Sequence, residues 1–363
     1  MKEILILNRR DIRNPDSGGA EIYTHEIFKR LADKYQITHF SAYFKGSERK
    51  ETIDRICYIR GGSELTTHVS GFLFALRERG KYDLIIDQFN GIGFMTVGFK
   101  NSIMLIHQLY RDFWCAQMGA VGHIFKAVEL FMLRLYKAKL VVAVSESTKA
   151  DLIANGFDGK EIAIVPNGAA QIDFSPKEIF EPVVMYLGRL TKTKNPEQAI
   201  KAFLLAKQKK PELAMYVAGN GEERQRLESK YKDVKDLQFL GYVTGELKYE
   251  LLRKASLLIV PSIREGWGQV VIEANMAGTP VVGYNVEGLR DSVIDGETGF
   301  LVSRGDIAAL AEKISALLTD KKLLCRVSIN AINHAKKFSW AESAKAMEGL
   351  LVNQIDKNRV EFK

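Results

Sequence analysis

Short apolar runs alternate with longer amphipathic or polar stretches along the whole chain. Runs rich in Ile, Leu and Val are typical of parallel strands that are buried on both faces, and the helix-length segments between them are typical of β-α-β crossovers. The strand candidates of the first half are Glu3–Leu7, Ile37–Ala42, Ile56–Arg60, Asp83–Asp87, Ile103–His107, Leu140–Val144 and Ile162–Val165. This alternation predicts a doubly wound α/β unit.

The same alternation resumes in the second half of the chain. Its strand candidates are Val183–Leu187, Leu213–Ala218, Leu237–Leu240, Leu257–Val260 and Pro280–Gly283. The stretch Asn167–Pro182 reads as a linker, and a length of 363 residues suits two cores rather than one. We therefore predict an α/β protein with two Rossmann-like domains, residues 1–170 and 171–339. The segment after Trp340 predicts one last helix, about 340–363, with no strand behind it.

Composition is that of a globular protein, with 46% hydrophobic and 26% charged residues. No apolar run approaches the ~18 residues of a membrane span, and the N-terminal run is too short for a signal peptide. The three cysteines, Cys57, Cys115 and Cys325, are far apart in sequence, which fits a reducing compartment. We therefore expect a cytoplasmic location, with the inner face of the cell membrane as a further option.

The net charge of +8 admits nucleic acid, anionic lipid or phosphorylated substrates as partners. The excess is spread over both halves of the chain, and no basic run of five residues occurs. A nucleic-acid partner is therefore disfavoured.

The densest chemical signal is the segment 261–274, which follows the strand candidate Leu257–Val260 and enters a helix. Gly266 and Gly268 let a ligand approach the backbone, and the helix start from Trp267 through Gln269 to Val270 offers amides to a phosphate. Within this segment, Glu273 lies five residues after Gly268, which is ~7.5 Å along a helix, and a carboxylate there can accept ribose hydroxyls. Glu265, in the loop before the helix, can accept sugar hydroxyls. Acids at a helix start are also favoured by the dipole alone, so these glutamates by themselves leave both interpretations open.

A cationic turn follows the first strand candidate of the second half. Gly188 and Arg189 end this strand, and Lys194 stands just before the next helix. Two cations beside a helix N-terminus suit a diphosphate and would stabilise charge that develops on a departing group. The turn is not a P-loop, because the G-x-x-x-x-G-K-[ST] pattern is absent.

Gly18 and Gly19 join the first strand candidate to the first helix and again allow backbone contact with phosphate or sugar. His107 lies at the carboxyl edge of a strand candidate, a position that favours contact with a ligand. No metal-ligand cluster or D-x-D pair occurs, so we expect no metal. Gly219 opens a lone G-x-G without the third glycine of a dinucleotide fingerprint, which disfavours an NAD oxidoreductase.

Together these features resemble glycosyltransferase family 4. The segments that carry the resemblance are the GG loop, His107, Val165–Gly168, Gly188–Arg189 with Lys194, Gly219–Gly221, Glu265-x7-Glu273 and Gly278–Val282. The resemblance covers nearly the whole chain, and the E-x7-E segment is its most specific part. It implies the GT-B fold, in which two Rossmann-like domains face each other across a cleft, and retaining transfer from a nucleotide-diphosphate sugar. The final helix would return to the first domain.

The resemblance also implies roles for single residues. Arg189 and Lys194 would bind the donor diphosphate, Glu273 the ribose and Glu265 the sugar hydroxyls, with His107 beside the transferred sugar. Backbone contacts would come from Gly19 in one domain and from Gly268, Gln269 and Val270 in the other. Asn167 is a weaker assignment. The family's Gly-Gly-x-x-Glu pattern is replaced by the segment Glu287–Asp291, so neither Gly288 nor Asp291 is assigned a role.

The predicted function is therefore a retaining hexosyltransferase that uses a UDP- or GDP-sugar as co-substrate, without a further cofactor, in glycoconjugate or polysaccharide biosynthesis. The expected acceptor is a glycan or a lipid-linked molecule. The alternatives are a nucleotide-sugar epimerase of the same fold and a non-catalytic two-lobed sugar- or nucleotide-binding protein.

The stretch Ala116–Lys139 combines an apolar stripe with basic flanks and has two interpretations. It is either a helix in the first domain's core, which we favour, or a peripheral contact with an anionic membrane.

Overall fold

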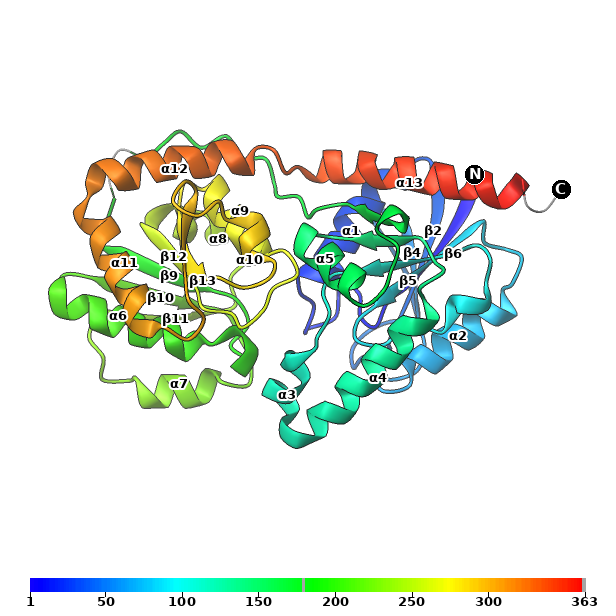
Figure 1. The fold of residues 1–363 in the computed structure, drawn as a ribbon, viewed down its shortest axis with the longest axis horizontal. Coiled ribbons are helices and arrows are strands. Elements are labelled where there is room, and N and C mark those ends of the chain that lie inside the picture. The colour runs from blue at the N-terminus through cyan, green and yellow to red at the C-terminus, as the bar shows by residue number, and fades with distance from the viewer. Residues whose placement is uncertain (178–179, 361–363) are drawn as a thin grey trace. The chain divides into compact units, whose positions relative to one another are not determined.

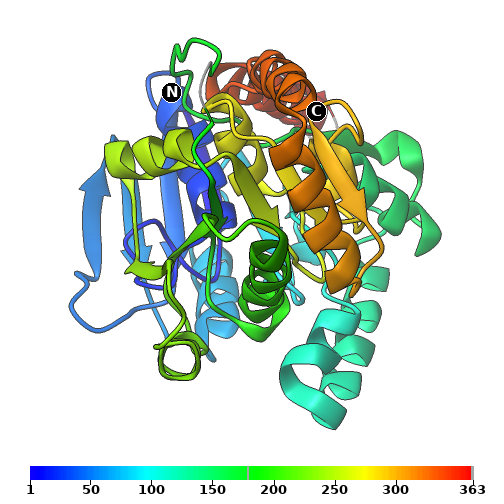
Figure 2. The same cartoon turned by 90° about the vertical axis from the view of Figure 1, so that its left-hand side faces the viewer.

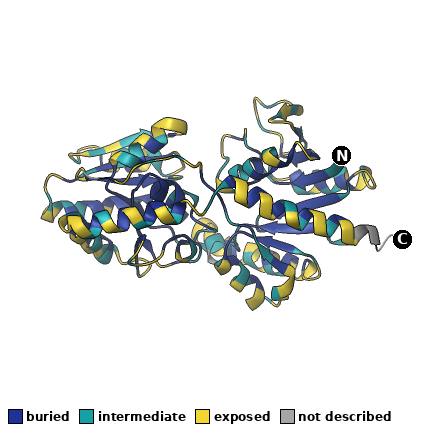
Figure 3. Cartoon of the chain, turned by 90° about the horizontal axis from the view of Figure 1, so that it is seen from above, coloured by how far each residue is buried: buried dark blue, intermediate teal, exposed yellow. Residues whose placement is uncertain are grey.

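The computed structural model describes residues 1–177 and 180–360, and it divides the chain into two compact units. The N-terminal unit contains Met1–Gly168 together with the segment from Trp340 onward, and the C-terminal unit is Ala169–Ser339. Each unit is a parallel or, in the N-terminal unit, mostly parallel sheet covered by helices on both faces (Figure 1). The central strands are buried in both units, whereas the covering helices expose one side (Figure 3).

The N-terminal sheet has eight strands in the order β3-β4-β2-β1-β5-β6-β7-β8. Its strands are β1 (Lys2–Leu7), β2 (Tyr35–Ser41), β3 (Lys50–Ile53), β4 (Ile56–Arg60), β5 (Leu84–Phe89), β6 (Ser102–Ile106), β7 (Val141–Ala143) and β8 (Ile162–Ile164). All neighbours pair in parallel except β3, which runs antiparallel to β4 at the edge. The chain moves outward from β1 to β2 in one direction and from β5 to β6 in the other, so the topological switch point lies between β1 and β5.

Helices cover both faces of this sheet. They are α1 (Gly19–Leu31), α2 (Thr67–Arg77), α3 (Asp112–Met118), α4 (Gly122–Leu135), α5 (Glu146–Ala154) and α13 (Trp340–Val360), with the 3₁₀ turns η1 (Thr96–Gly98), η2 (Gly119–Val121) and η3 (Gly159–Glu161). On one face, α13 packs along α1 through buried side chains at helical spacing, Ala344, Met347, Leu351 and Ile355 (Figure 1). On the other face, α2 and α4 pack on β1, β5 and β6.

The C-terminal sheet has six parallel strands in the order β11-β10-β9-β12-β13-β14. They are β9 (Val183–Leu187), β10 (Ala214–Ala218), β11 (Leu237–Gly241), β12 (Leu257–Val260), β13 (Val281–Tyr284) and β14 (Gly299–Val302). The covering helices are α6 (Pro196–Lys209), α7 (Arg224–Lys230), α8 (Gly245–Lys254), α9 (Gln269–Met276), α10 (Leu289–Ser292), α11 (Ile307–Thr319) and α12 (Lys321–Ala335), and the turn η4 is Lys192–Lys194. Figures 1 and 2 show α6 and α11 side by side on this sheet.

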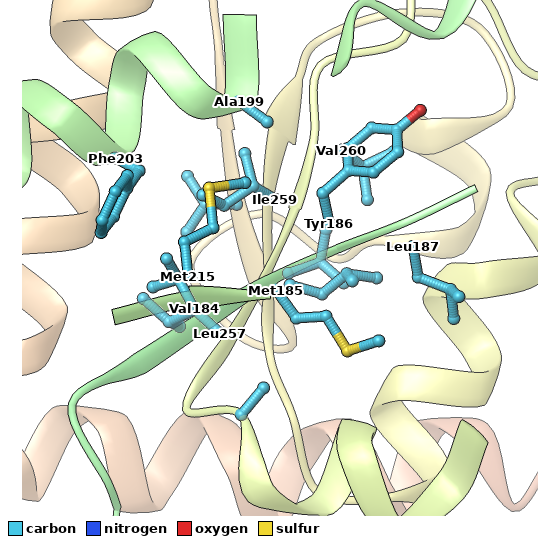
Figure 4. Close-up of a cluster of buried hydrophobic side chains, with 14 of the residues drawn as sticks. Val184, Met185, Tyr186, Leu187, Ala199, Phe203, Met215, Leu257, Ile259 and Val260 are labelled. Atoms are coloured by element: carbon cyan, nitrogen blue, oxygen red, sulfur yellow. The ribbon is translucent and has the colours of Figure 1, made fainter. Parts of the chain in front are cut away.

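The core of the C-terminal unit forms around its central strands. Three neighbouring strands contribute buried side chains to it: Val184 and Met185 on β9, Met215 on β10, and Leu257 and Ile259 on β12 (Figure 4). This packing holds the carboxyl ends of β9 and β12 side by side, where the candidate chemistry lies.

The structure differs from the sequence prediction in three places. The edge strands β3 and β14 were not predicted. β3 (Lys-Glu-Thr-Ile) is polar and lacks an apolar run, whereas β14 has only the three apolar residues Phe300–Val302 behind a turn. The stretch Ala116–Lys139 is not one helix: α3 ends at Met118, and Gly119 adopts a φ of +59° before α4 begins. The favoured packing of this stretch in the core is only half right, because Met132 and Leu133 are buried whereas many of its other apolar side chains are exposed.

Candidate functional site

The topological switch point of the C-terminal sheet lies between β9 and β12. From β9 the chain moves outward through β10 to β11, and from β12 it moves outward through β13 to β14 in the opposite direction. The loops after β9 and β12 therefore diverge, which is the usual place for a ligand in an open α/β sheet. These loops contain the predicted residues Arg189, Lys194 and Glu265.

Lys194 and Glu265 meet across the switch point. Lys194 Nζ lies 2.5 Å from Glu265 Oε1, and both side chains are largely buried. Two further hydrogen bonds join the loops. The Ile263 N–H donates to the Thr193 carbonyl at 3.0 Å, and the side-chain amide of Asn195 donates from Nδ2 to the Pro261 carbonyl at 3.0 Å. The ion pair therefore lies between two loops that hydrogen bonds hold together.

Arg189 is exposed beside this pair, and its guanidinium forms no ion pair with any residue that the structure describes. Its backbone is fixed, because the Tyr186 hydroxyl donates to the Arg189 carbonyl at 2.8 Å. Figure 4 shows the Tyr186 ring in the core cluster with its hydroxyl at the edge. Burial raises the pKa of this hydroxyl, and the Glu265 carboxylate raises it further. Tyr186 therefore stays protonated and keeps donating, while the Arg189 side chain is available to an anion.

Glycines allow the loops after β9 and β10 to touch. A Cβ on Gly219, whose φ is +143°, would lie 1.9 Å from the Gly188 carbonyl oxygen. The Leu190 N–H donates to the Asn220 carbonyl at 2.8 Å, which locks the two loops together. The G-x-G of Gly219–Gly221 thus has a packing reason that is unrelated to a dinucleotide fingerprint. It fixes the turn that carries Arg189.

The amino end of α9 completes this side of the site. Gly268 caps the helix with a left-handed φ of +83°, and the amide groups of the first turn, at Gln269 and Val270, face out of the helix end. Trp267 is buried against Phe338, with ring centroids 5.0 Å apart. This contact fixes the loop that precedes the helix, so the positive end of the helix dipole is held at a defined place, as helix amino ends that bind anions are.

Glu273 lies on α9 and is buried, with 6% of its surface exposed. Its Oε1 accepts from Lys248 Nζ at 2.8 Å and from Gln269 Nε2 at 3.4 Å. Its Oε2 forms no hydrogen bond with any described residue, so one oxygen remains for a ligand hydroxyl. Lys248 was missed in the sequence, because it lies on α8, in an ordinary amphipathic pattern.

Gly288 was also left without a role by the sequence analysis. A Cβ at this residue would lie 2.4 Å from the Glu265 carbonyl oxygen, and its φ is +78°. Asp291 Oδ2 accepts from the Gly288 N–H at 3.1 Å. The segment after β13 therefore supports the Glu265 loop through its backbone.

Gly18, Gly19, His107 and Asn167 belong to the N-terminal unit. Gly18 precedes α1, and its N–H donates to Glu21 Oε2 at 2.7 Å. His107 follows β6, and its ring stands edge-on to Tyr23 with centroids 5.0 Å apart. Burial lowers the pKa of His107 to about 4, and its Nε2 has no hydrogen-bond partner among the described residues. The imidazole is therefore neutral near pH 7 and has one ring nitrogen to offer.

Tyr23 connects the predicted residues of the N-terminal unit, although the sequence did not single it out. It lies on α1, four residues after Gly19, touches His107, and donates from its hydroxyl to the Val165 carbonyl at 3.0 Å. Asn8 and Asn90, which follow β1 and β5 at the switch point of this sheet, were not singled out in the sequence either. Asn90 Nδ2 donates to Asn8 Oδ1 at 3.0 Å. Both contacts join segments that are far apart in sequence, so no local pattern could reveal them.

Across residues 1–177 and 180–360, no group of three or more His, Cys, Asp or Glu side chains is placed to hold a metal ion. No helix in these ranges is long and apolar enough to cross a membrane.

Comparison with known families assigns both halves of the chain. Residues 17–170 match the model described as Glycosyltransferase Family 4, and residues 170–334 match the model described as Glycosyl transferases group 1.

Two D-inositol 3-phosphate glycosyltransferases are similar in sequence. The enzyme of Corynebacterium jeikeium is 31% identical over 395 residues, which cover 92% of this chain and 91% of that protein. The chain belongs to the family 4 and group 1 glycosyltransferases. The enzyme of Nocardia farcinica is 32% identical over 234 residues, which cover 59% of this chain and 51% of that protein. In that match the glycosyltransferase chain spans about half the length of its relative.

Solved structures confirm the fold. Sucrose-phosphate synthase from Thermosynechococcus elongatus has a TM-score of 0.80 at 21% identity, covering 99% of this chain and 100% of that chain. Anabaena HepE in complex with UDP-glucose has a TM-score of 0.75 at 20% identity, covering 97% and 100%. The predicted GT-B class, built from two Rossmann-like units, is thus confirmed for this glycosyltransferase.

Proposed function

We propose that this glycosyltransferase moves a hexosyl group from a nucleotide-diphosphate sugar to a glycan or lipid-linked acceptor, with retention of anomeric configuration and without a metal. The enzyme would act in glycoconjugate or polysaccharide biosynthesis. It would be located in the cytoplasm, in peripheral contact with an anionic membrane. The observation that carries the proposal is the meeting of Lys194 and Glu265 across the switch point, next to the exposed Arg189 and the amino end of α9.

The charges of this site fit a sugar diphosphate. Arg189, Lys194 and the first-turn amides of α9 would bind the two phosphates, since cations and helix amino ends both favour phosphate oxygens. The open Oε2 of Glu273 would accept a ribose hydroxyl. Glu265 would bind the sugar hydroxyls, so its contact with Lys194 would link recognition of the sugar to that of the phosphate.

In the proposed transfer, the bond between the anomeric carbon and the diphosphate oxygen breaks. The acceptor hydroxyl oxygen bonds to that carbon on the same face, and its proton passes to the departing diphosphate. The negative charge on the diphosphate grows as the bond breaks, so donors aimed at it stabilise the transition state more than the ground state. The neutral His107 would offer a hydrogen bond beside the transferred sugar.

A panel of donors tests this proposal. The protein is incubated with UDP-glucose, other UDP-sugars and GDP-sugars, with and without lipid-linked and free glycan acceptors, in the presence of EDTA. UDP-glucose comes first, because the HepE structure of similar fold contains it. Nucleotide release that depends on an acceptor, with a product of unchanged anomeric configuration by NMR, is the expected result.

Each alternative has its own outcome in this panel. Conversion of the donor sugar without an acceptor would identify an epimerase. Binding of nucleotide without any turnover would identify a binding protein. Activity that is abolished by EDTA and restored by Mg²⁺ would contradict the metal-free part of the proposal.

A further inference from the structure

The helix α4 and the residue just before it expose a continuous apolar stripe that nothing in the N-terminal unit covers among the described residues. Its members, here called the docking stripe, recur at alternating spacings of three and four residues: Val121, Ile124, Val128, Phe131 and Leu135. Their exposed fractions run from 37% for Leu135 to 65% for Ile124. This spacing places all five on one side of the helix. Contiguous exposed apolar side chains of this kind mark an interaction surface.

The docking stripe is not a poorly packed part of the core, because α4 has a separate buried side. Met132, Leu133 and Tyr136 fill the space over Phe89 and Met104 of the sheet. The helix is therefore apolar on two adjoining sides, and only one of them is used by the fold.

The hairpin of α3 and α4 is held rigid from within (Figure 1). Trp114 of α3 stacks on Phe125 of α4 with ring centroids 5.2 Å apart. Glu129 is buried and accepts from the backbone N–H groups of Tyr110 at 2.7 Å and Arg111 at 2.9 Å. The stripe therefore stands on a preformed element and does not need to order on binding.

Apart from the buried Glu129, the charged residues of α4 and of the segment just after it are basic. Arg134 and Lys137 are exposed next to it, on the last turn of α4 and just beyond. Glu129 is the only acidic residue in the sequence from 113 to 145, and its carboxylate is used inside the hairpin. A long basic side chain can lay its apolar stem along a bilayer and place its charge among headgroups. A second copy of this chain would bring the same positive charges against each other.

A second apolar stripe lies on the same side of the N-terminal sheet. It consists of Leu65, just before α2, and Val69, Leu73 and Leu76 on α2, all of them exposed. The helix α2 packs on Leu5, Leu7 and Ile85, and α4 packs on Phe89, Met104 and Ile106. In the parallel register these two sets point to the same face of the sheet, because Leu7 pairs with Asp87 and Phe89 pairs with Ile106. The exposed apolar side chains are thus gathered on one flank of the unit.

We propose that the docking stripe inserts into an anionic lipid bilayer, with Arg134 and Lys137 among the headgroups. The apolar side of α4 would then lie at the level of the headgroup–acyl boundary, as amphipathic helices do at interfaces. The inference rests on the proposed function to the extent that it favours the lipid-linked acceptor over a free glycan. It identifies the surface by which the enzyme reaches such an acceptor.

Vesicle flotation tests the proposal independently of sugar transfer. The full chain is mixed with phosphatidylcholine vesicles, with or without phosphatidylglycerol, at low and high salt. We expect flotation with the anionic vesicles only, weakened by salt. The double variant Ile124→Ser/Phe131→Ser should lower the partition coefficient at least tenfold. Arg134→Gln/Lys137→Gln should lower it about 30-fold, since each basic residue near an anionic surface contributes about a fivefold factor.

Matched variants keep the test specific. Leu205→Ser/Val352→Ser removes two exposed apolar side chains elsewhere, and Lys232→Gln/Lys235→Gln removes two exposed charges elsewhere. Both should float like the unchanged protein. The melting temperature of each variant, with and without donor nucleotide, shows that it is folded and that the donor site is intact.

Three results would overturn the proposal. The first is a protein that stays with the buffer when anionic vesicles float. The second is flotation that is unchanged by the stripe variant. The third is a dimer in light scattering that becomes a monomer in Ile124→Ser/Phe131→Ser, which would assign the stripe to a second copy of the chain. Failure of the donor panel with intact flotation would instead count against the proposed function alone.

Discussion

At the scale of single residues, the candidate donor site is built from charges that already satisfy one another. Lys194 pairs with Glu265, and Lys248 pairs with Glu273. Each pair is partly or wholly buried, so breaking it by removing one partner leaves the other charge uncompensated. A ligand that brings its own charges and hydroxyls can share these partners, whereas a neutral apolar ligand cannot.

Replacing Lys194 or Arg189 by Ala is expected to lower kcat by roughly 10²- to 10³-fold, the usual effect of losing one donor to a developing anion. The donor KM should change far less, because the charge that these cations meet grows only as the bond breaks. Initial-rate kinetics over a range of donor concentrations measure both. Lys192→Ala, on the same turn but exposed, is the control and should match the unchanged enzyme. A raised KM with unchanged kcat in both variants would contradict the assigned role.

Lys248 is expected to act as a positioning residue through Glu273. Lys248→Met should raise the donor KM about tenfold with little effect on kcat, since ribose contacts are equal in the ground and transition states. Lys248→Arg should restore most of the affinity, because a guanidinium can also hold Glu273. Lys254→Met, on the same helix, serves as the control. Equal losses of kcat and kcat/KM in Lys248→Met would argue for a role in the transition state instead.

At the scale of elements, the strands could be predicted from the sequence and their supports could not. Every apolar run singled out as a strand candidate overlaps a strand, because a parallel strand buried on both faces needs apolar side chains in both directions. The polar edge strand β3 lacks that pattern. Loop residues such as Lys194 and Glu265 could be found because they directly follow strands.

The supports of the site are a different case. Tyr23, Asn8 and Lys248 gain their roles from partners dozens of residues away in the chain, and Gly288 gains its role from the close approach of the Glu265 loop. Such contacts depend on register and packing between elements. A single sequence contains no local signal for them.

The junction of the β9 and β10 loops is expected to tolerate no side chain. Gly219→Ala would place a Cβ on the Gly188 carbonyl oxygen and strain a backbone with φ of +143°, so we expect a loss of about 3 kcal/mol or more in the free energy of unfolding. Urea denaturation measures it. Gly349→Ala is the control: this residue lies inside α13 with open space around its Cβ position, and the change should stabilise by about 1 kcal/mol. Equal stability of both variants would contradict the close approach.

At the scale of the whole molecule, the two units are expected to respond to pH in different ranges. Burial lowers the pKa of His39, His68 and His107 to about 4, and all three lie in the N-terminal unit. Between pH 6.5 and 4 these three histidines are protonated in the unfolded chain but stay neutral in the folded protein. The stability of this unit therefore falls as the pH falls through that window, by on the order of 3 kcal/mol for each histidine.

The C-terminal unit contains a case of the same sign at higher pH. Burial lowers the pKa of Lys177 to about 7, while its Nζ donates to the Ala255 carbonyl at 2.6 Å. The unfolded lysine keeps its proton up to about pH 10.5. The contribution of Lys177 to stability therefore rises with pH from about 7 to 10.5.

Calorimetry at pH 4.5, 5.5, 7 and 9 checks both pH windows. The expected result is a first transition that moves to lower temperature on acidification and belongs to the N-terminal unit. His68→Gln should flatten this dependence, and the exposed His123→Gln should leave it unchanged. Transitions that move together at all pH values would contradict the assignment of the histidines to one unit.

The chain leaves the N-terminal unit after Gly168 and returns to it only at Trp340. The outgoing and returning segments run together at the seam, where the Ala169 N–H donates to the Phe338 carbonyl at 3.0 Å. On a ribosome, the side of α1 that packs against α13 stays uncovered until the entire inserted unit has been synthesised. The N-terminal unit is therefore synthesised first but completed last. A chain truncated before Trp340 would leave this apolar surface of α1 accessible to chaperones and proteases.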